Sequence, residues 1–161
     1  MTRDFSQMIQ EFRRHWKYYV FQSLFATLAT FAVLLVLQFQ HLVISASIGS
    51  TVFIVFAMPK SVTARPRNVI GGHLTGFFCG SLCALIPHAT VVVTLGVYAL
   101  AVGISMFLMV VFDMEHPPAS GTALGVVIHG FSGSILLALL AASLVFSLIH
   151  FIFYKHIRDL V

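Results

Sequence analysis

The tract Met114–Thr122 gathers residues that could do chemistry in a chain that is otherwise strongly apolar. It contains two adjacent prolines, a titratable imidazole at His116, and small hydroxyl-bearing residues. Asp113 and Glu115 lie beside His116 and could relay a proton or tune the pH response of the imidazole. Charge and broken backbone are unfavourable in a bilayer, so they usually serve a function there. The tract is therefore the first candidate site.

Two adjacent prolines predict a helix start, because proline has a fixed φ and no N–H to donate. The first N–H groups of such a helix lack intrahelical partners, and with the positive end of the helix dipole they can bind an anion. A similar set of hydroxyl residues occurs in the first half of the chain. The predicted binding residues are Ser45, Ser47, Gly49, Ser50, Thr51, His73, His116, Pro117, Pro118, Ala119, Ser120, Gly121 and Thr122. Alternatively, the hydroxyls only bond to their own helices.

The apolar stretches contain no Lys or Arg, which a multivalent anion such as phosphate normally recruits. This favours a compact monovalent solute such as nitrite, nitrate, formate or chloride, or a small neutral molecule. No nucleophile elbow, zincin motif or phosphate-cradling loop occurs, so we do not expect an enzyme. A haem held by His73 and His150 has no supporting motif, and no metal or other cofactor is predicted. Cys79 and Cys83 are interpreted as small packing residues.

The composition predicts an all-α polytopic membrane protein. Of the 161 residues, 59% are hydrophobic and only 9% are charged, too few to cover the surface of a soluble domain. Charge-free stretches occupy residues 20–38, 42–58, 69–86, 90–112, 119–131 and 134–154. Four of them reach the roughly 18 residues that a spanning helix requires. We predict about six segments, two of them short or broken; the alternative is five crossings and a re-entrant loop at 116–131.

The net charge of +4 does not indicate nucleic-acid binding, because the basic residues lie at the borders of the apolar stretches. They cluster before the first stretch, in the segment 60–68 and after the last stretch. The positive-inside rule places all three clusters, and hence both termini, in the cytoplasm, which requires an even number of crossings. The segments 40–41 and 87–88 are then external. The predicted location is the inner membrane of a bacterium.

The order of segments repeats: a long stretch, a short hydroxyl-rich one, and a long one. Moving Gly49 onto Gly121, a shift of 72 residues, also brings Ser50 onto Thr122. Three crossings per half would make the halves inverted repeats, an arrangement typical of transporters, with the amino ends of the short helices pointing toward each other. The single domain, 1–161, then consists of a cytoplasmic interfacial helix (1–19), two three-helix halves (20–88 and 89–154) and a cytoplasmic tail (155–161).

A ladder of small residues predicts a close helix contact in the third stretch. Gly72, Gly76 and Gly80 recur at intervals of four, so another backbone can approach this face. Ala138 and Ala142 of the last stretch could supply the matching surface.

Two motifs together resemble the HPP family of small integral membrane proteins. They are His116-Pro117-Pro118-Ala119-Ser120-Gly121-Thr122-Ala123-Leu124 and, upstream, Pro66-Arg67-Asn68-Val69-Ile70-Gly71-Gly72-His73. The resemblance covers about residues 21–154 and implies nitrite transport. The predicted partners are the lipid bilayer and a small monovalent anion, with a homo-oligomer as a further option. The competing hypotheses are a membrane sensor or scaffold without transport activity, and a histidine-based metal- or haem-binding module.

Overall fold

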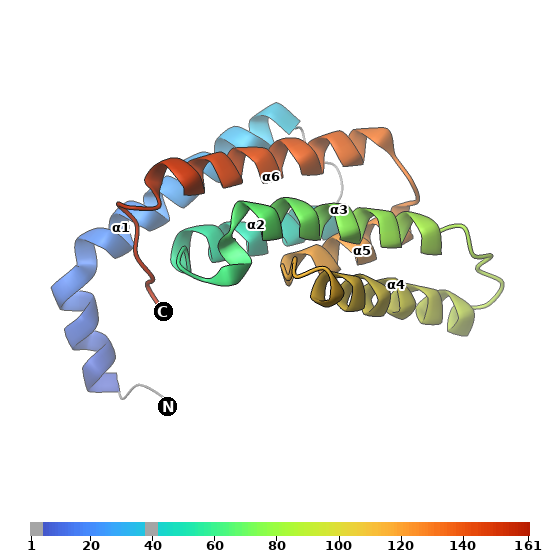
Figure 1. The fold of residues 1–161 in the computed structure, drawn as a ribbon, viewed down its shortest axis with the longest axis horizontal. Coiled ribbons are helices and arrows are strands. Elements are labelled where there is room, and N and C mark those ends of the chain that lie inside the picture. Colours follow the sequence, from blue (N-terminus) through green and yellow to red (C-terminus); the bar gives the residue numbers. More distant parts are fainter. Residues whose placement is uncertain (1–4, 38–41) are drawn as a thin grey trace.

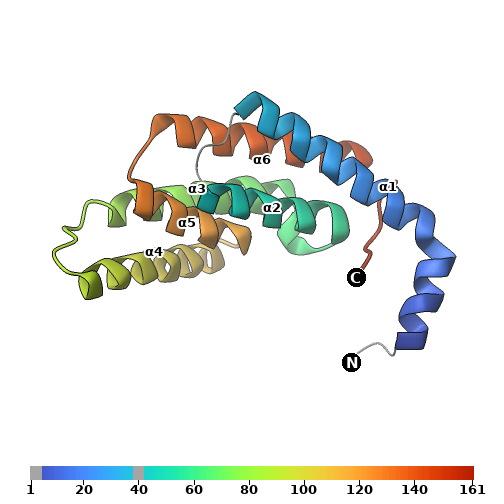
Figure 2. The same ribbon diagram turned by 180° about the vertical axis from the view of Figure 1, so that it is seen from behind.

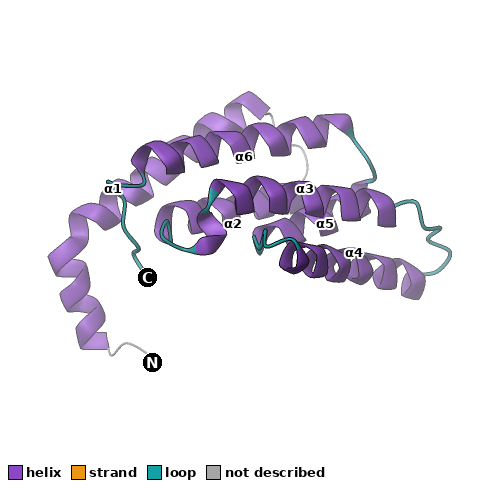
Figure 3. Cartoon of the chain, in the orientation of Figure 1, coloured by secondary structure: helices purple, strands orange, loops and turns teal. Residues whose placement is uncertain are grey.

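The computed structural model of the chain describes residues 5–37 and 42–161, and the regular structure of these residues is helical throughout (Figure 3). The elements, in chain order, are α1 (Phe5–Leu37), α2 (Leu42–Ala57), the short 3₁₀ helix η1 (Val62–Ala64), α3 (Pro66–Cys83), α4 (Val91–Val111), α5 (Pro118–His129) and α6 (Gly133–Phe153). This confirms the predicted fold class of six helical segments.

Local sequence explains where several helices begin and end. Thr90 caps α4, since its hydroxyl oxygen accepts a hydrogen bond from the Val93 N–H at 3.3 Å. The helices α3 and α5 both carry proline in the first turn, where a missing N–H does no harm. Gly130 ends α5 with a φ of 81°, a backbone conformation that glycine adopts without steric strain.

The beginning of α1 and the carboxyl-terminal tail lie toward the same end of the bundle (Figure 1). The tail after α6 returns to α1 and α2: the Tyr19 hydroxyl donates to the Leu160 carbonyl, and the Leu160 N–H donates to the Ala57 carbonyl, both at 2.9 Å. The buried Gln22 amide also donates to the Arg158 carbonyl at 2.9 Å. The tail after α6 therefore lies beside the part of α1 around Tyr19 and Gln22. The number of membrane crossings, and with it the five-crossing alternative, stays a prediction.

The part of α1 before Tyr19, dark blue in Figure 1, projects away from the bundle. Its side chains Phe12 and Trp16 are about half exposed. The predicted external pair Gln40-His41 lies outside the described residues.

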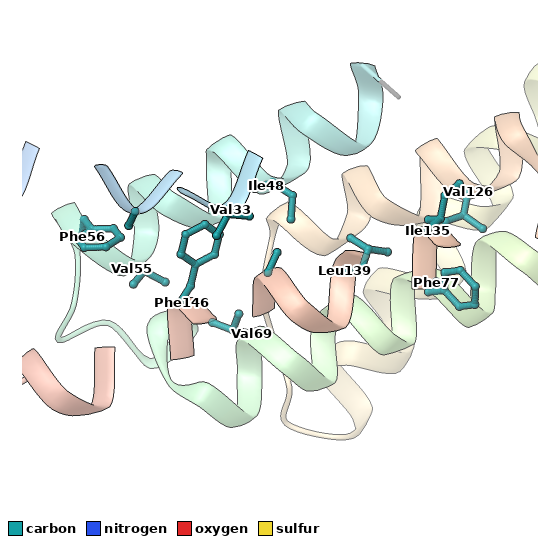
Figure 4. Packing of buried hydrophobic residues seen from close by; sticks show 12 residues of the cluster. Val33, Ile48, Val55, Phe56, Val69, Phe77, Val126, Ile135, Leu139 and Phe146 are labelled. Carbon is teal, nitrogen blue, oxygen red and sulfur yellow. The ribbon is translucent and has the colours of Figure 1, made fainter. Parts of the chain in front are cut away.

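An apolar core runs between α1, α2, α3, α5 and α6 (Figure 4). Phe77 of α3 and Phe146 of α6 are completely buried there, as is Val126 of α5. A smaller cluster joins α3, α4 and α5, and it includes Cys83. Cys79 and Cys83 are both buried and unbridged, which confirms their prediction as packing residues.

Large apolar side chains also cover the outside of the bundle, as expected for a protein surrounded by lipid. The helices α4 and α6 are each 21 residues long and apolar enough to cross a membrane. In contrast, the 12 residues of α5 extend about 18 Å at the usual rise of a helix, too short to cross the roughly 30 Å hydrocarbon core alone. In the predicted inverted repeat, α3 corresponds to α6 and α5 corresponds to α2, so the two helix pairs should pack alike. They do not, because α3 packs closely along α5 whereas α6 contacts α2 much less. The inverted repeat therefore stays a prediction.

The glycine ladder of α3 packs against α5 rather than against α6. A Cβ atom on Gly80 would lie 2.5 Å from the Ala123 carbonyl oxygen, and one on Gly76 would overlap the Ala119 carbonyl oxygen. The prediction of a close helix contact is therefore confirmed, but the predicted partner, the Ala138–Ala142 face, is wrong. The true partner face consists of Ala119, Ala123 and Val126 of α5.

Candidate functional site

Five buried polar side chains meet where α2, α3 and α5 pack together. Ser47 and Thr51 lie one turn apart on α2, His73 comes from α3, His116 from the loop before α5, and Thr122 from α5. None of the five is more than 3% exposed. We refer to these five side chains as the polar network.

The members of the polar network form one continuous row of contacts. The hydroxyl oxygen of Thr51 lies 2.9 Å from Nε2 of His73 and 3.0 Å from Nε2 of His116. On the other side of its ring, His73 Nδ1 lies 2.8 Å from the Thr122 hydroxyl, which is 2.8 Å from the Ser47 hydroxyl. The two imidazole rings approach edge to face, with centroids 5.0 Å apart.

Each end of this row stops at a backbone carbonyl. The Ser47 hydroxyl donates to the Pro118 carbonyl at 2.6 Å, and His116 Nδ1 lies 2.8 Å from the Thr63 carbonyl of η1. A carbonyl oxygen only accepts hydrogen bonds, so His116 must carry its proton on Nδ1. Four separate parts of the chain thus hold the row in place.

Small residues of α3 allow the loop of His116 to lie against the helix. A Cβ atom on Gly72 would lie only 2.6 Å from Cβ of His116 and 3.3 Å from Cβ of Ala119. The neighbouring Gly71 is packed equally closely against the side chain of Met114. The glycine pair before His73 therefore explains how the two histidines reach the same hydroxyl group.

The first turn of α3 fastens the same loop from the outside. The Asn68 amide donates to the Glu115 carbonyl at 3.1 Å, and the Arg67 guanidinium donates to the Phe112 carbonyl at 2.9 Å. Arg67 also forms an exposed ion pair with Asp113 at 3.1 Å. Asp113 has a φ of 54°, a left-handed conformation that Asp tolerates better than most residues. The two sequence motifs are therefore one structural unit.

Two expectations about the start of α5 are wrong. The N–H of Ala119 donates to the His116 carbonyl at 2.8 Å and that of Ser120 to the Pro117 carbonyl at 3.1 Å, so these predicted free donors are already bonded. The short helices also do not meet at their amino ends. Seen from behind, they lie side by side (Figure 2), with the start of α5 against Ser47 in the second turn of α2.

The polar network unites five of the predicted binding residues, and three more line it. Pro118 and Ala119 are buried beside it, and Gly121 packs against Ser47, whose Cβ would lie 3.4 Å from a Cβ atom added to the glycine. The other predicted residues lie apart. Gly49 and Ser50 are exposed, Pro117 is exposed, Ser120 is half-buried, and the side chain of Ser45 lies outside the described residues. The Ser50 hydroxyl donates to the Ala46 carbonyl of its own helix at 3.1 Å, as the alternative interpretation expected.

The carboxylates predicted to tune His116 are placed differently from each other. Asp113 pairs with Arg67 at the surface, whereas Glu115 is half-buried and contributes its carbonyl to Asn68. His150, the other haem-ligand candidate, bonds through Nε2 to the Pro59 carbonyl at 2.8 Å. In the described part of the chain, no three His, Cys, Asp or Glu side chains come close enough together to hold a metal ion.

Sequence reasoning missed three contributors to the site: the Thr63 carbonyl and the side chains of Arg67 and Asn68. Arg67 and Asn68 belong to a recognised motif, yet nothing in their spacing indicated that they fasten a loop 45 to 47 residues away. Thr63 contributes only backbone, which sequence patterns do not reveal.

This apolar bundle with a buried polar centre defines a helical integral membrane protein. The model of the transmembrane region of the HPP family matches residues 11–159, so the chain belongs to that family. Two transmembrane proteins of Dictyostelium discoideum are similar. One is 35% identical over 106 residues, covering 60% of this chain and 37% of that protein; the other is 30% identical over 106 residues, covering 60% and 34%. The chain thus matches about a third of the length of these curated relatives. No solved structure matches it.

Proposed function

We propose that the protein is a membrane transporter or facilitator of a small monovalent anion, with nitrite as the leading candidate. The observation that carries this proposal is the polar network itself: five polar side chains buried between two short helices and α3. Burying polar groups at this depth is unfavourable unless they are paired, and such groups usually mark a pathway for a polar solute.

The chemistry of the polar network favours a singly charged anion. Its possible donors are three hydroxyls and two imidazoles, all without formal charge when the histidines are neutral. A phosphate group would need the stronger, charge-assisted bonds of Arg or Lys. The basic residue nearest in the motif, Arg67, is exposed and engaged with the loop. Nitrite, nitrate, formate and chloride need fewer and weaker donors.

Binding would proceed by exchange of partners. Because the hydroxyls and imidazoles are bonded to one another and to three backbone carbonyls, an anion must replace an internal acceptor. The replaced acceptor must then find another donor, since an unpaired buried group is unfavourable by about 1–3 kcal/mol. Ser47 of α2 contacts Pro118 and Thr122 of α5 and is the least buried of the five side chains. Separation of α5 from α2 would therefore open the row of hydrogen bonds at Ser47.

We further propose that the end bearing both termini faces the cytoplasm. Lys60, Arg65 and Arg67 lie at this end with Lys155 and Arg158, and a cytoplasmic excess of basic residues is the general rule for membrane proteins. Labelling of single cysteines, in a background without Cys79 and Cys83, would test the orientation.

Flux into proteoliposomes tests the transport proposal. We expect the purified protein to accelerate entry of nitrite over that into empty liposomes, with nitrate, formate and chloride compared under the same gradient. A sensor or scaffold would move none of these anions. A sulfate or phosphate flux exceeding that of nitrite would contradict the argument from the absence of Lys and Arg.

A further inference from the structure

The row of contacts in the polar network has a fixed direction at both ends. The Thr63 and Pro118 carbonyls can only accept, so His116 Nδ1 and the Ser47 hydroxyl must donate outward. Since Ser47 has only one proton, its oxygen must accept from Thr122. The oxygen of Thr122 must in turn accept from Nδ1 of His73.

The uncharged row has one proton too few. Six contacts join the five side chains from one carbonyl to the other, and each contact needs one proton. Three hydroxyls and two neutral imidazoles supply one proton each, and therefore five. The shortage falls on Thr51, where two unprotonated Nε2 atoms face a single hydroxyl proton. The Ser47 carbonyl, 3.1 Å from the same hydroxyl, competes for that proton as well.

One added proton completes the row. With a proton on Nε2 of His116, this imidazolium donates to Thr51, and Thr51 donates to Nε2 of His73. The reversed arrangement, with the proton on His73, serves equally well because Thr51 lies 2.9 and 3.0 Å from the two nitrogens. Thr51 can therefore pass the charge between the rings without any movement of heavy atoms.

A second proton is disfavoured, because two imidazolium rings with centroids 5.0 Å apart repel each other. The surrounding charges do not change this count. The helix α2 carries no titratable residue, and η1 carries none. On α3 and the loop, Arg67 pairs with Asp113 at the surface. Among the described residues, neither imidazole donates a hydrogen bond to the carboxylate of the half-buried Glu115. Burial disfavours binding of even the first extra proton, because it disfavours a charged imidazolium. The contact at Thr51 that lacks a proton favours this binding, because the proton completes the hydrogen bonds of the row.

We propose that the polar network binds one extra proton, shared by His73 and His116 through Thr51, and that this proton crosses the membrane together with the anion. The second part rests on the proposed transport function, whereas the first does not. One proton and one monovalent anion carry no net charge, so their joint burial avoids most of the unfavourable desolvation of either ion alone. The buried pair of histidines is thus assigned the role of a coupling site.

Proton binding is tested without any transport, by ¹⁵N NMR of histidine-labelled protein in nanodiscs. As the pH is lowered, we expect one proton to be taken up jointly, with the Nε2 resonances of His73 and His116 moving together. Thr51→Val, which removes the bridge, should separate the two titrations, and Thr51→Ser should restore the joint one. His88→Gln removes an exposed loop histidine and should leave both resonances unchanged. Two independent protonations in the wild type, or two rings neutral until the protein unfolds, would overturn the proposal.

Coupling is tested by accumulation of nitrite in proteoliposomes under an inward proton gradient. A neutral pair should accumulate about tenfold for each unit of pH difference, whatever the membrane potential. Accumulation that follows the potential and ignores the pH gradient would overturn coupling while leaving anion transport intact. Joint proton uptake without flux of any anion would instead overturn the transport function on which coupling rests.

Discussion

The two short helices carry similar small hydroxyl residues but occupy different surroundings. The helix α5 is packed against α3 through the glycine ladder, and its residues Pro118, Ala119 and Thr122 are buried. The helix α2 divides its tract between two faces. Ser47 and Thr51 point to the polar network, whereas Gly49 lines an apolar groove of about 460 Å³ beside α1. Position on the helix, more than composition, therefore decides which residues belong to the site.

This difference predicts opposite responses to the same added methyl group. Gly76→Ala would place Cβ on the backbone carbonyl of Ala119, which cannot move without displacing α5, and overpacking of this kind destabilises by about 1–3 kcal/mol. Gly49→Ala meets no atom within 4 Å and should be neutral or slightly stabilising. Thermal unfolding in detergent compares the two variants. Equal stability of both would show that α3 and α5 are less tightly packed than described.

Removal of a hydroxyl from the buried face of α5 should have the next largest effect. Thr122→Val keeps the shape but leaves His73 Nδ1 and the Ser47 oxygen without their partner, which is unfavourable by about 1–3 kcal/mol. Thr94→Val, on α4, removes a hydroxyl that bonds only to the Thr90 carbonyl of the preceding turn and serves as the control. Denaturation curves measure the free energy of unfolding of both variants. A Thr122→Val protein as stable as the control would mean that the polar network contributes little to folding.

The two faces of α2 can be compared with one pair of substitutions. Ser47→Ala removes a donor from the polar network and should weaken nitrite binding by about 0.5–1.5 kcal/mol. Ser50→Ala, three residues along the same helix, removes a hydroxyl bonded to Ala46 and should leave binding unchanged. Calorimetric titration with nitrite distinguishes them. A loss of affinity for Ser50→Ala alone would move the site to the outer face of α2.

The smallest effect is expected at the surface of the loop. Asp113→Asn breaks an ion pair whose side chains are 63% and 75% exposed, and exposed pairs contribute at most about 1 kcal/mol. Asn tolerates the left-handed backbone at this position as well as Asp does. Stability and the pH dependence of flux should both stay close to those of the wild type. A shifted pH dependence of flux would support the prediction that Asp113 tunes the pH response of His116.

Much of the fold could be predicted from sequence because lipid imposes simple rules. Length and hydropathy predicted the segments now seen as α3, α4 and α6 to within a few residues. The partner of the glycine ladder could not be predicted, since packing depends on which helix offers a complementary face. Ala138 and Ala142 had the right spacing, yet α5 occupies that face of α3.

The candidate site was predicted in its members but not in its chemistry. The two motifs supplied both histidines and Thr122, and the hydroxyl-rich stretch of the first half supplied Ser47 and Thr51. The expected anion donors, the N–H groups of Ala119 and Ser120, are instead used within the first turn of α5. Hydrogen bonds to backbone carbonyls, such as that from His116 to Thr63, leave no trace in sequence. These carbonyls determine the direction of every donor in the row except Thr51, and the shortage of one proton therefore falls on that residue.

The most direct test of the central claim, that the polar network is the transport site, is the initial rate of nitrite entry into proteoliposomes. The wild type would be compared with the double variant Ser47→Ala, Thr122→Val, and with Ser50→Ala, at equal amounts of folded protein. We predict that the wild type and Ser50→Ala carry nitrite at similar rates and that the double variant is slower by about tenfold or more, the loss of about 1.4 kcal/mol or more of binding. Equal rates for the wild type and the double variant would contradict the claim.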